Sequence, residues 1–308
     1  MAKILIIGGG AAGMAAAVFL GEKNHQVHLF EKNEKLGKKL FITGKGRCNI
    51  TNTCDDETFF KSVVTNAKFL YSAFYGYSNQ DVVSFFENLG LAVKEERGGR
   101  IFPVSDHSSR ILEKRMKELD VKVHLKSEAE ALLTEEGENG ERKIKGIRLR
   151  NGAEILGEKV IVATGGFSYQ ATGSTGDGYT FAKEAGHTVT QLRPALVPIA
   201  TKEEYVTQMQ GLALKNIRFT VKDGKKVLYD DFGELLFTHF GISGPLVLTA
   251  SSYIGKKLEK KELQGYIDLK AALTEEQLDA RLLREFEAGI NRQFKNVITG
   301  MFPAKLYP

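Results

Sequence analysis

Three glycines near the start of the chain are spaced as in turns that bind phosphate groups. Gly8, Gly10 and Gly13 give the pattern GxGxxG between an apolar run at 3–7 and an alanine-rich run at 11–20. Glycine permits a tight turn at the first position, close approach to a pyrophosphate at the second, and close helix–strand packing at the third. Glu31 ends a second apolar run, where its carboxylate would accept hydrogen bonds from a ribose diol. The pattern predicts a dinucleotide site at a helix start, where negative charge is favoured.

Two further glycine-rich segments indicate which dinucleotide binds. Residues 44–46 follow the second apolar run closely, and residues 173–178 stand directly before a helical segment. An NAD site does not need these additional loops, so we expect FAD. Residues 32–47 also carry five lysines and one arginine against Glu34 alone. This basic stretch is either a solvated loop or a loop that faces phosphate or carboxylate groups, and Lys38 is expected on its exposed side.

The composition is that of an ordinary globular protein. The 308 residues include 43 Lys and Arg against 38 Asp and Glu, and 42% of the residues are apolar. These values exclude a disordered, collagen-like or coiled-coil chain. Residues 4–21 are uncharged, but their glycine spacing and the strand that follows favour a nucleotide-binding turn over a membrane span. With only two cysteines, the chain fits a reducing, cytoplasmic location.

An alternation of strand-like and helical segments predicts an α/β fold. Strands are expected at 3–7, 26–30, 121–125 and 160–163, and helices at 11–20, 59–75, 80–89, 108–119 and 181–185. Asn151-Gly152 and Asp223-Gly224 predict hairpin turns, 266–269 reads as a strand, and Thr274 opens a capping box for a helix to about 288. We expect a nucleotide-binding α/β domain at 1–187 and a smaller β-rich domain at 188–308.

Longer segments resemble one family of flavoproteins. The stretches KILIIGGGAAGMAAA, TGKGRCN, VIVATGGFSYQATGSTGDGY and FTHFGISGP are similar to those of the BaiN/YhiN-type NAD(P)/FAD-dependent oxidoreductases, also described as aminoacetone oxidase-like. The resemblance implies a Rossmann-like FAD domain of the glutathione-reductase type with an inserted, smaller, β-rich and barrel-like domain. Members of the family return to the FAD domain after the inserted one, so we expect this chain to be truncated and to hold flavin weakly.

The resemblance also assigns residues to the cofactor. The glycine turn and Glu31 hold the ADP half of FAD, and Ala129 lies near the adenine. Arg47, Cys48 and Asn49 line the flavin side, and residues 163–165 and 176–178 lie close to the cofactor. The expected cofactor-binding residues are Gly8, Gly10, Ala11, Ala12, Gly13, Glu31, Lys32, Gly46, Arg47, Cys48, Asn49, Ala129, Ala163, Thr164, Gly165, Gly176, Asp177 and Gly178.

We expect the flavin to carry the chemistry, because the sequence has no nucleophile pattern and no metal-ligand spacing. Lys45 or Arg47 would stabilise negative charge at the N1/C2 edge of reduced flavin. His239 is either a structural residue or an acid/base that faces the substrate. Cys48 and Cys54 lie too far apart for a disulfide within a helix, so Cys48 is expected to line the pocket.

The sequence therefore predicts an FAD-dependent oxidoreductase that transfers a hydride between a small organic substrate and flavin. NAD(P)H or oxygen is the other redox partner. Two alternatives stay open: a flavoprotein acting in RNA modification, and a non-catalytic nucleotide-binding module. Because basic residues are scattered along the chain, we expect no nucleic-acid partner, and we expect no membrane partner. The identity of the substrate and the oligomeric state stay open.

Overall fold

A computed structural model describes residues 1–105, 109–137 and 141–306 of the chain. The chain divides into two compact units, residues 1–190 and 191–308, beside the boundary expected at 187–188. Each unit has its own apolar core and is described by itself. Among the described residues, no helix combines the length and the apolar character that a membrane crossing requires.

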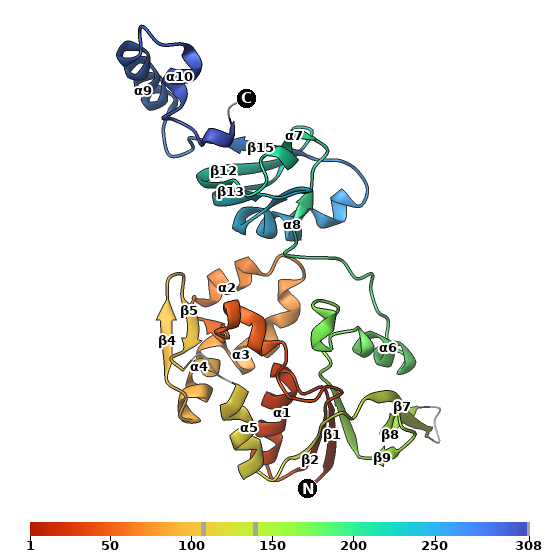
Figure 1. Cartoon of the computed structure of the whole chain (residues 1–308). Coiled ribbons are helices and arrows are strands. Elements are labelled where there is room, and N and C mark those ends of the chain that lie inside the picture. The colour runs from red at the N-terminus through yellow and green to blue at the C-terminus, as the bar shows by residue number, and fades with distance from the viewer. Residues whose placement is uncertain (106–108, 138–140, 307–308) are drawn as a thin grey trace. The chain divides into compact units, whose positions relative to one another are not determined.

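The first unit is built on a four-stranded parallel sheet with the strand order β10-β1-β2-β6 (Figure 1). Its strands are β1 (Lys3–Ile7), β2 (Gln26–Phe30), β6 (Lys122–His124) and β10 (Lys159–Val162). All four lie within two residues of the strands that the sequence predicts. Ile7 is paired with Phe30 on one side and with Val162 on the other. The carboxyl ends of three strands therefore meet at one edge, where ligands bind in open α/β sheets.

Two helices cover one face of this sheet. Helix α1 (Ala11–Glu22) follows the glycine turn directly, and α5 (Ser109–Glu118) presents a stripe of apolar side chains with charges on its other face. Met14 and Val18 of α1 pack with Leu112 and Met116 of α5 in a fully buried core. This packing fixes where α1 begins, and so fixes the position of the glycine turn.

The opposite face is covered by a three-stranded antiparallel sheet and a helix. The strands are β7 (Ala129–Glu136), β8 (Arg142–Leu149) and β9 (Glu154–Leu156), and the helix is α6 (Asp177–Glu184). Asn151-Gly152 forms the predicted turn between β8 and β9. Leu5, Phe30, Ile147 and Phe181 join both layers in one core.

The remaining elements of the unit match the expected ones only in part. The single helix expected at 59–75 is wrong: α2 (Asp56–Ser62) ends at Val63, which is extended, and Asn66 takes a left-handed φ of 56° before α3 (Tyr71–Gly76). β-branched residues and asparagine disfavour a helix interior at this point. Helix α4 (Asn79–Asn88) is as predicted. An additional small sheet contains β3 (Thr51–Asn52), β4 (Val93–Glu96) and β5 (Arg100–Pro103).

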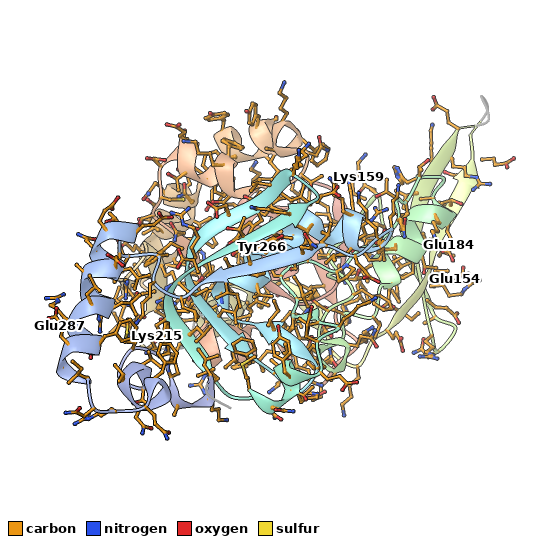
Figure 2. All side chains as sticks on the ribbon, turned by 90° about the horizontal axis from the view of Figure 1, so that it is seen from above. Glu154, Lys159, Glu184, Lys215, Tyr266 and Glu287 are labelled. Atoms are coloured by element: carbon orange, nitrogen blue, oxygen red, sulfur yellow. The ribbon has the colours of Figure 1, made fainter. Side chains whose placement is uncertain are left out.

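The second unit is a five-stranded antiparallel sheet packed against a helix. The strand order is β11 (Ile199–Ala200), β14 (Gly241–Ser243), β13 (Lys226–Phe237), β12 (Ala213–Asp223) and β15 (Gln264–Asp268). Asp223-Gly224 forms the expected hairpin turn, and Tyr266 marks the outer strand β15 (Figure 2). Helix α8 (Pro245–Leu258) buries Leu246, Val247 and Ile254 against the sheet.

Three further helices complete the second unit: α7 (Tyr205–Gln208), α9 (Glu275–Ala288) and α10 (Phe294–Ile298). The predicted capping box is present at α9, because the Thr274 side chain accepts from the Gln277 N–H while the Gln277 side chain accepts from the Thr274 N–H.

Candidate dinucleotide site

A cavity of about 530 Å³ opens at the carboxyl ends of β1, β2 and β10. This volume lies within the range of sites for drug-sized ligands and cofactors. The cavity is lined by the glycine turn, the ends of the parallel strands, and the segments 31–43, 127–129 and 172–177. Every lining residue belongs to the first unit.

Two of the glycines in the turn are required by packing. A Cβ atom on Gly8 would stand 2.5 Å from the carbonyl oxygen of Ala163, and Gly8 also has a φ of 105°. A Cβ on Gly13 would stand 1.8 Å from the carbonyl oxygen of Gly8. The N–H of Gly8 donates to the carbonyl of Phe30 at 2.8 Å. These contacts hold β1, β2, β10 and α1 together at the mouth of the cavity.

Gly10 is different, because packing does not require it. Its φ of −81° is available to any residue, and a Cβ would meet nothing within 4 Å. Gly10 lines the cavity, so a side chain here would fill the space beside the start of α1. That helix has no side-chain cap and no acidic residue in its first turn. The backbone N–H groups at its start thus remain available for an anion, and the open cradle fits a pyrophosphate.

Glu31 is buried beside the turn, with 8% of its surface exposed. Its Oε2 accepts from the N–H of Gly9 at 2.8 Å, and its Oε1 accepts from both the backbone N–H and the side-chain amide of Asn33. These bonds fix the carboxylate in the cavity wall. Since each carboxylate oxygen has two lone pairs, capacity remains for a ribose hydroxyl.

Two lysines join the segments on either side of the cavity. Lys32 Nζ donates to Asp177 at 2.7 Å and to Thr175 at 2.6 Å. Lys39 Nζ donates to the hydroxyl of Ser174 at 2.6 Å and to the carbonyl of Ser168 at 2.8 Å. The basic stretch therefore faces the second glycine loop, rather than being only a solvated loop.

Most of the expected cofactor-binding residues line the cavity together. They are Gly8, Gly10, Ala11, Ala12, Glu31, Lys32, Ala129, Ala163, Thr164, Gly165 and Asp177. Gly13 and Gly178 lie behind the lining, and Gly178 leaves room for the hydroxyl of Thr164, which a Cβ would approach to 2.6 Å. Gly176 also stands outside the lining, as the N-cap of α6 with a φ of 88°.

Several lining residues in or beside the basic stretch and the second glycine loop were not among the expected cofactor-binding residues, namely Asn33, Lys38, Lys39, Leu40, Thr43, Thr172, Gly173 and Ser174. The expectation that Lys38 faces solvent is wrong, because Lys38 lines the cavity and contacts Asn33 Oδ1 at 3.4 Å. The density of lysines in 32–47 was the signal that could have identified these residues.

The segment expected at the flavin side lies outside the cavity lining. Arg47 pairs with Glu96 at 2.7 Å and stacks over the ring of Phe102 at 4.3 Å. Asn49 donates to the carbonyl of Ile101, while Cys48 is buried with a left-handed φ of 57°. Gly46 ends a 3₁₀ turn that begins at residue 40. This segment is fastened to the β4–β5 hairpin, and its flavin contacts remain a prediction.

Three other expectations concern single side chains. The side chain of Lys45 lies outside the described residues. His239 is exposed in the second unit and contacts Phe240 edge to face at 4.8 Å, so its role stays a prediction. No disulfide joins Cys48 and Cys54, both of which are described residues.

A pair of histidines lies beside Phe30, which lines the cavity. The ring nitrogens of His28 and His124 are 3.1 Å apart, and the ring of Phe30 stacks on that of His124 with centroids 4.5 Å apart. Burial lowers the pKa of both histidines, and the nearby charge of Lys3 lowers the pKa further. The neutral form of the pair is therefore favoured in the folded protein.

The protein-family model described as HI0933-like protein Rossmann domain matches residues 2–284 of this chain. The chain belongs to the HI0933-like family. This membership confirms the resemblance found in the sequence, and the parallel sheet with its glycine turn is the Rossmann-like fold expected.

Two curated relatives match almost the whole HI0933-like chain. A 3-dehydro-bile acid delta(4,6)-reductase of Clostridium scindens is 32% identical over 100% of this chain and 74% of its own length. A ribosomal RNA dihydrouridine synthase of Haemophilus influenzae is 31% identical over 98% of this chain and 72% of its own. Among solved structures, the 3-ketosteroid-delta4-(5alpha)-dehydrogenase of Rhodococcus jostii matches 70% of this chain and 59% of its own at 14% identity, with a TM-score of 0.49.

Proposed function

We propose that this HI0933-like protein is an FAD-dependent oxidoreductase that reduces a carbon–carbon double bond conjugated to a carbonyl group. The observation that carries the proposal is the open cradle at Gly10, which packing does not need and which adjoins the start of α1. An adjacent buried carboxylate at Glu31 completes the arrangement that suits the ADP half of FAD.

Named groups of the chain would hold each part of the ADP half of the dinucleotide. The N–H groups at the start of α1 bind the pyrophosphate, and Glu31 binds the ribose. Ala129 and Glu128 line the end of the cavity near the β7 strand, where the adenine fits. When bound, FAD supplies hydride transfer that no side chain can perform alone. The chain itself binds, orients and shields the cofactor.

The names of the relatives support the choice of substrate. The Clostridium scindens relative is a delta(4,6)-reductase of a 3-dehydro-bile acid, and the Haemophilus influenzae relative forms dihydrouridine. In both, a hydride and a proton add across a double bond that is conjugated to a carbonyl. Such a reduction needs an electron donor, so NAD(P)H suits the second redox partner and is oxidised to NAD(P)⁺. A reducing compartment such as the cytoplasm is consistent with Cys48 and Cys54, because no disulfide joins them.

The test follows flavin absorbance under anaerobic conditions. The purified protein is loaded with FAD, reduced with NADH or NADPH, and then mixed with a cyclic enone. We expect bleaching on reduction and recovery of the absorbance when the enone is added. Failure of the protein to take up FAD would overturn the proposal, as would reduced flavin that oxygen reoxidises but enones do not.

A second candidate substrate is uracil within RNA, favoured by the named activity of the Haemophilus influenzae relative. The C5–C6 double bond of uracil is conjugated to its C4 carbonyl, so the same chemistry applies. Mixing the reduced protein with a uridine-rich RNA, in place of the enone, distinguishes the two substrates.

A further inference from the structure

Two segments that lie far apart in the sequence bring six lysines together on the second unit. Lys225 and Lys226 form the tip of the β12–β13 hairpin, and four more follow at the end of α8. Asp223, at the end of β12, joins the two segments, because its carboxylate accepts from Lys257 at 2.9 Å and contacts Lys261 at 2.7 Å. We call Lys225, Lys226, Lys256, Lys257, Lys260 and Lys261 the lysine surface.

Asp223 is the carboxylate that pairs with the lysine surface, since the two neighbouring glutamates pair with other cations. Glu259 pairs with Arg193 at 3.1 Å, and Glu262 pairs with Lys202. Within residues 191–306, no ion pair involves Lys225, Lys226, Lys256 or Lys260, and all four are exposed. The two lysines that bind Asp223 lower its pKa to about 2, so six cations face one permanent anion at neutral pH.

The dipole of helix α8 explains only some of the lysines in the lysine surface. Cations at the end of a helix interact favourably with its dipole, which accounts for Lys256 and Lys257 in the last turn of α8. The dipole does not account for the two lysines on the hairpin tip. An exposed aromatic ring also stands beside the charge: Tyr253 is 46% exposed and precedes Lys256 and Lys257 by one helical turn.

We propose that the lysine surface binds the phosphate backbone of single-stranded RNA, with Tyr253 available to stack on a base. Spread ammonium groups neutralise successive phosphates, and an exposed aromatic ring accepts any base. This inference differs from the sequence expectation of no nucleic-acid partner, because the two lysine segments come together only in the folded structure. It rests on the second candidate substrate of the proposed function, uracil within RNA, since it names RNA as the carrier of the double bond.

The test compares two quadruple variants of the same net charge. The first removes the unpaired lysines of the surface: Lys225→Ala, Lys226→Ala, Lys256→Ala and Lys260→Ala. The matched control removes four exposed lysines of the first unit that form no ion pair among the described residues: Lys23→Ala, Lys117→Ala, Lys159→Ala and Lys183→Ala (Lys159 is marked in Figure 2). The probe is a fluorescein-labelled, uridine-rich RNA, and its anisotropy is recorded at several KCl concentrations.

We expect the surface variant to bind the RNA at least tenfold more weakly while the control stays within about twofold of the parent chain. The association constant K for the RNA decreases with salt, so the slope of log K against log [KCl] is negative. The magnitude of this slope should decrease by about 3 in the surface variant, at about 0.7 for each lost phosphate contact. Tyr253→Ala should weaken RNA binding without changing this slope. Equal losses in both quadruple variants would overturn the proposal in favour of overall charge.

Two further measurements separate the other outcomes. Binding of the surface to phosphatidylserine vesicles but not to RNA would assign it to a membrane instead, and would overturn the proposal. Enone reduction by the same variants reports on the proposed function independently. Unchanged enone reduction with lost RNA binding supports the inference, whereas loss of both FAD and RNA binding in the surface variant would overturn it.

Discussion

At the scale of single residues, substitutions at Gly10 and Gly13 test cofactor binding and folding separately. A Cβ atom at Gly10 would meet nothing within 4 Å, but a side chain there would occupy the cradle at the start of α1. We expect Gly10→Val to fold with a thermal unfolding midpoint close to that of the parent chain. Its affinity for FAD, measured by quenching of flavin fluorescence, should fall at least tenfold, which corresponds to about 1.4 kcal/mol.

Gly13→Ala provides the matched comparison. The added methyl would stand 1.8 Å from a backbone oxygen, so β1 and α1 must move apart. Overpacking of this kind costs about 1–3 kcal/mol or more, and the unfolding midpoint should fall without FAD present. If Gly10→Val lost stability and retained FAD, the assignment of the cradle would be wrong.

Arg47 offers a second test at this scale, because its ion pair with Glu96 can be removed while the guanidinium that would face the flavin is kept. Glu96→Gln keeps the guanidinium but removes its charged partner at 2.7 Å, and the loss of stability should be about 1 kcal/mol or less. If Arg47 also faces the flavin, as the sequence predicts, Arg47→Ala should weaken FAD binding about tenfold, whereas Glu96→Gln should not. Equal FAD affinities in the two variants would restrict Arg47 to fastening its loop to Phe102.

The residues of the glycine turn could be predicted from the sequence because backbone geometry demands them. Gly8 and Gly13 are needed for packing, and the spacing alone identifies them. Lys38 and Lys39 could not be assigned in this way, since a lysine is compatible with solvent or with a cavity wall. Only the fold brings Ser174, 135 residues away along the chain, within reach of Lys39.

At the scale of elements, two loops bound the cavity together with the strand ends. The segments 32–39 and 168–177 are joined by Lys32, Asn33 and Lys39. We expect Lys39→Met to increase amide hydrogen exchange in 168–177 about fivefold, through loss of about 1 kcal/mol of hydrogen bonding. Lys35→Met is the control, because Lys35 contacts the ring of Phe41 at 4.7 Å and lies outside the cavity lining. Similar exchange in both variants would contradict the link between the loops.

The regular elements of the first unit were predictable where their apolar pattern is strong. The four parallel strands and the helices α1, α4 and α5 follow from that pattern. Helix α8 was not predicted, because Thr249, Ser251 and Ser252 favour caps and turns over a helix interior. Packing of Leu246, Val247 and Ile254 against the sheet stabilises the helix, and a sheet partner is not visible in a local window of sequence.

At the scale of the whole molecule, the stacked histidines make folding stability depend on pH. The pKa of His28 and that of His124 lie below the ordinary value of 6.5. The unfolded chain therefore binds protons before the folded one does. The free energy of unfolding should be highest above about pH 7 and should decrease as the pH falls through 6.5 toward the lowered pKa values.

Urea unfolding at about pH 7.5 and about pH 5.5 tests this dependence. A double variant with His28→Asn and His124→Phe removes both titrating groups and keeps an aromatic ring against Phe30. Its free energy of unfolding should decrease less between the two pH values than that of the parent chain. An identical decrease would show that groups other than these two histidines account for the acid sensitivity.

All side chains that line the cavity come from residues 7–177, and none comes from the second unit. An evolving lineage could therefore change residues 191–308 without altering any residue that lines the dinucleotide cavity. The same partition suits protein engineering, because a chimera that joins another family member's second unit to this first unit would keep every residue of the cavity lining.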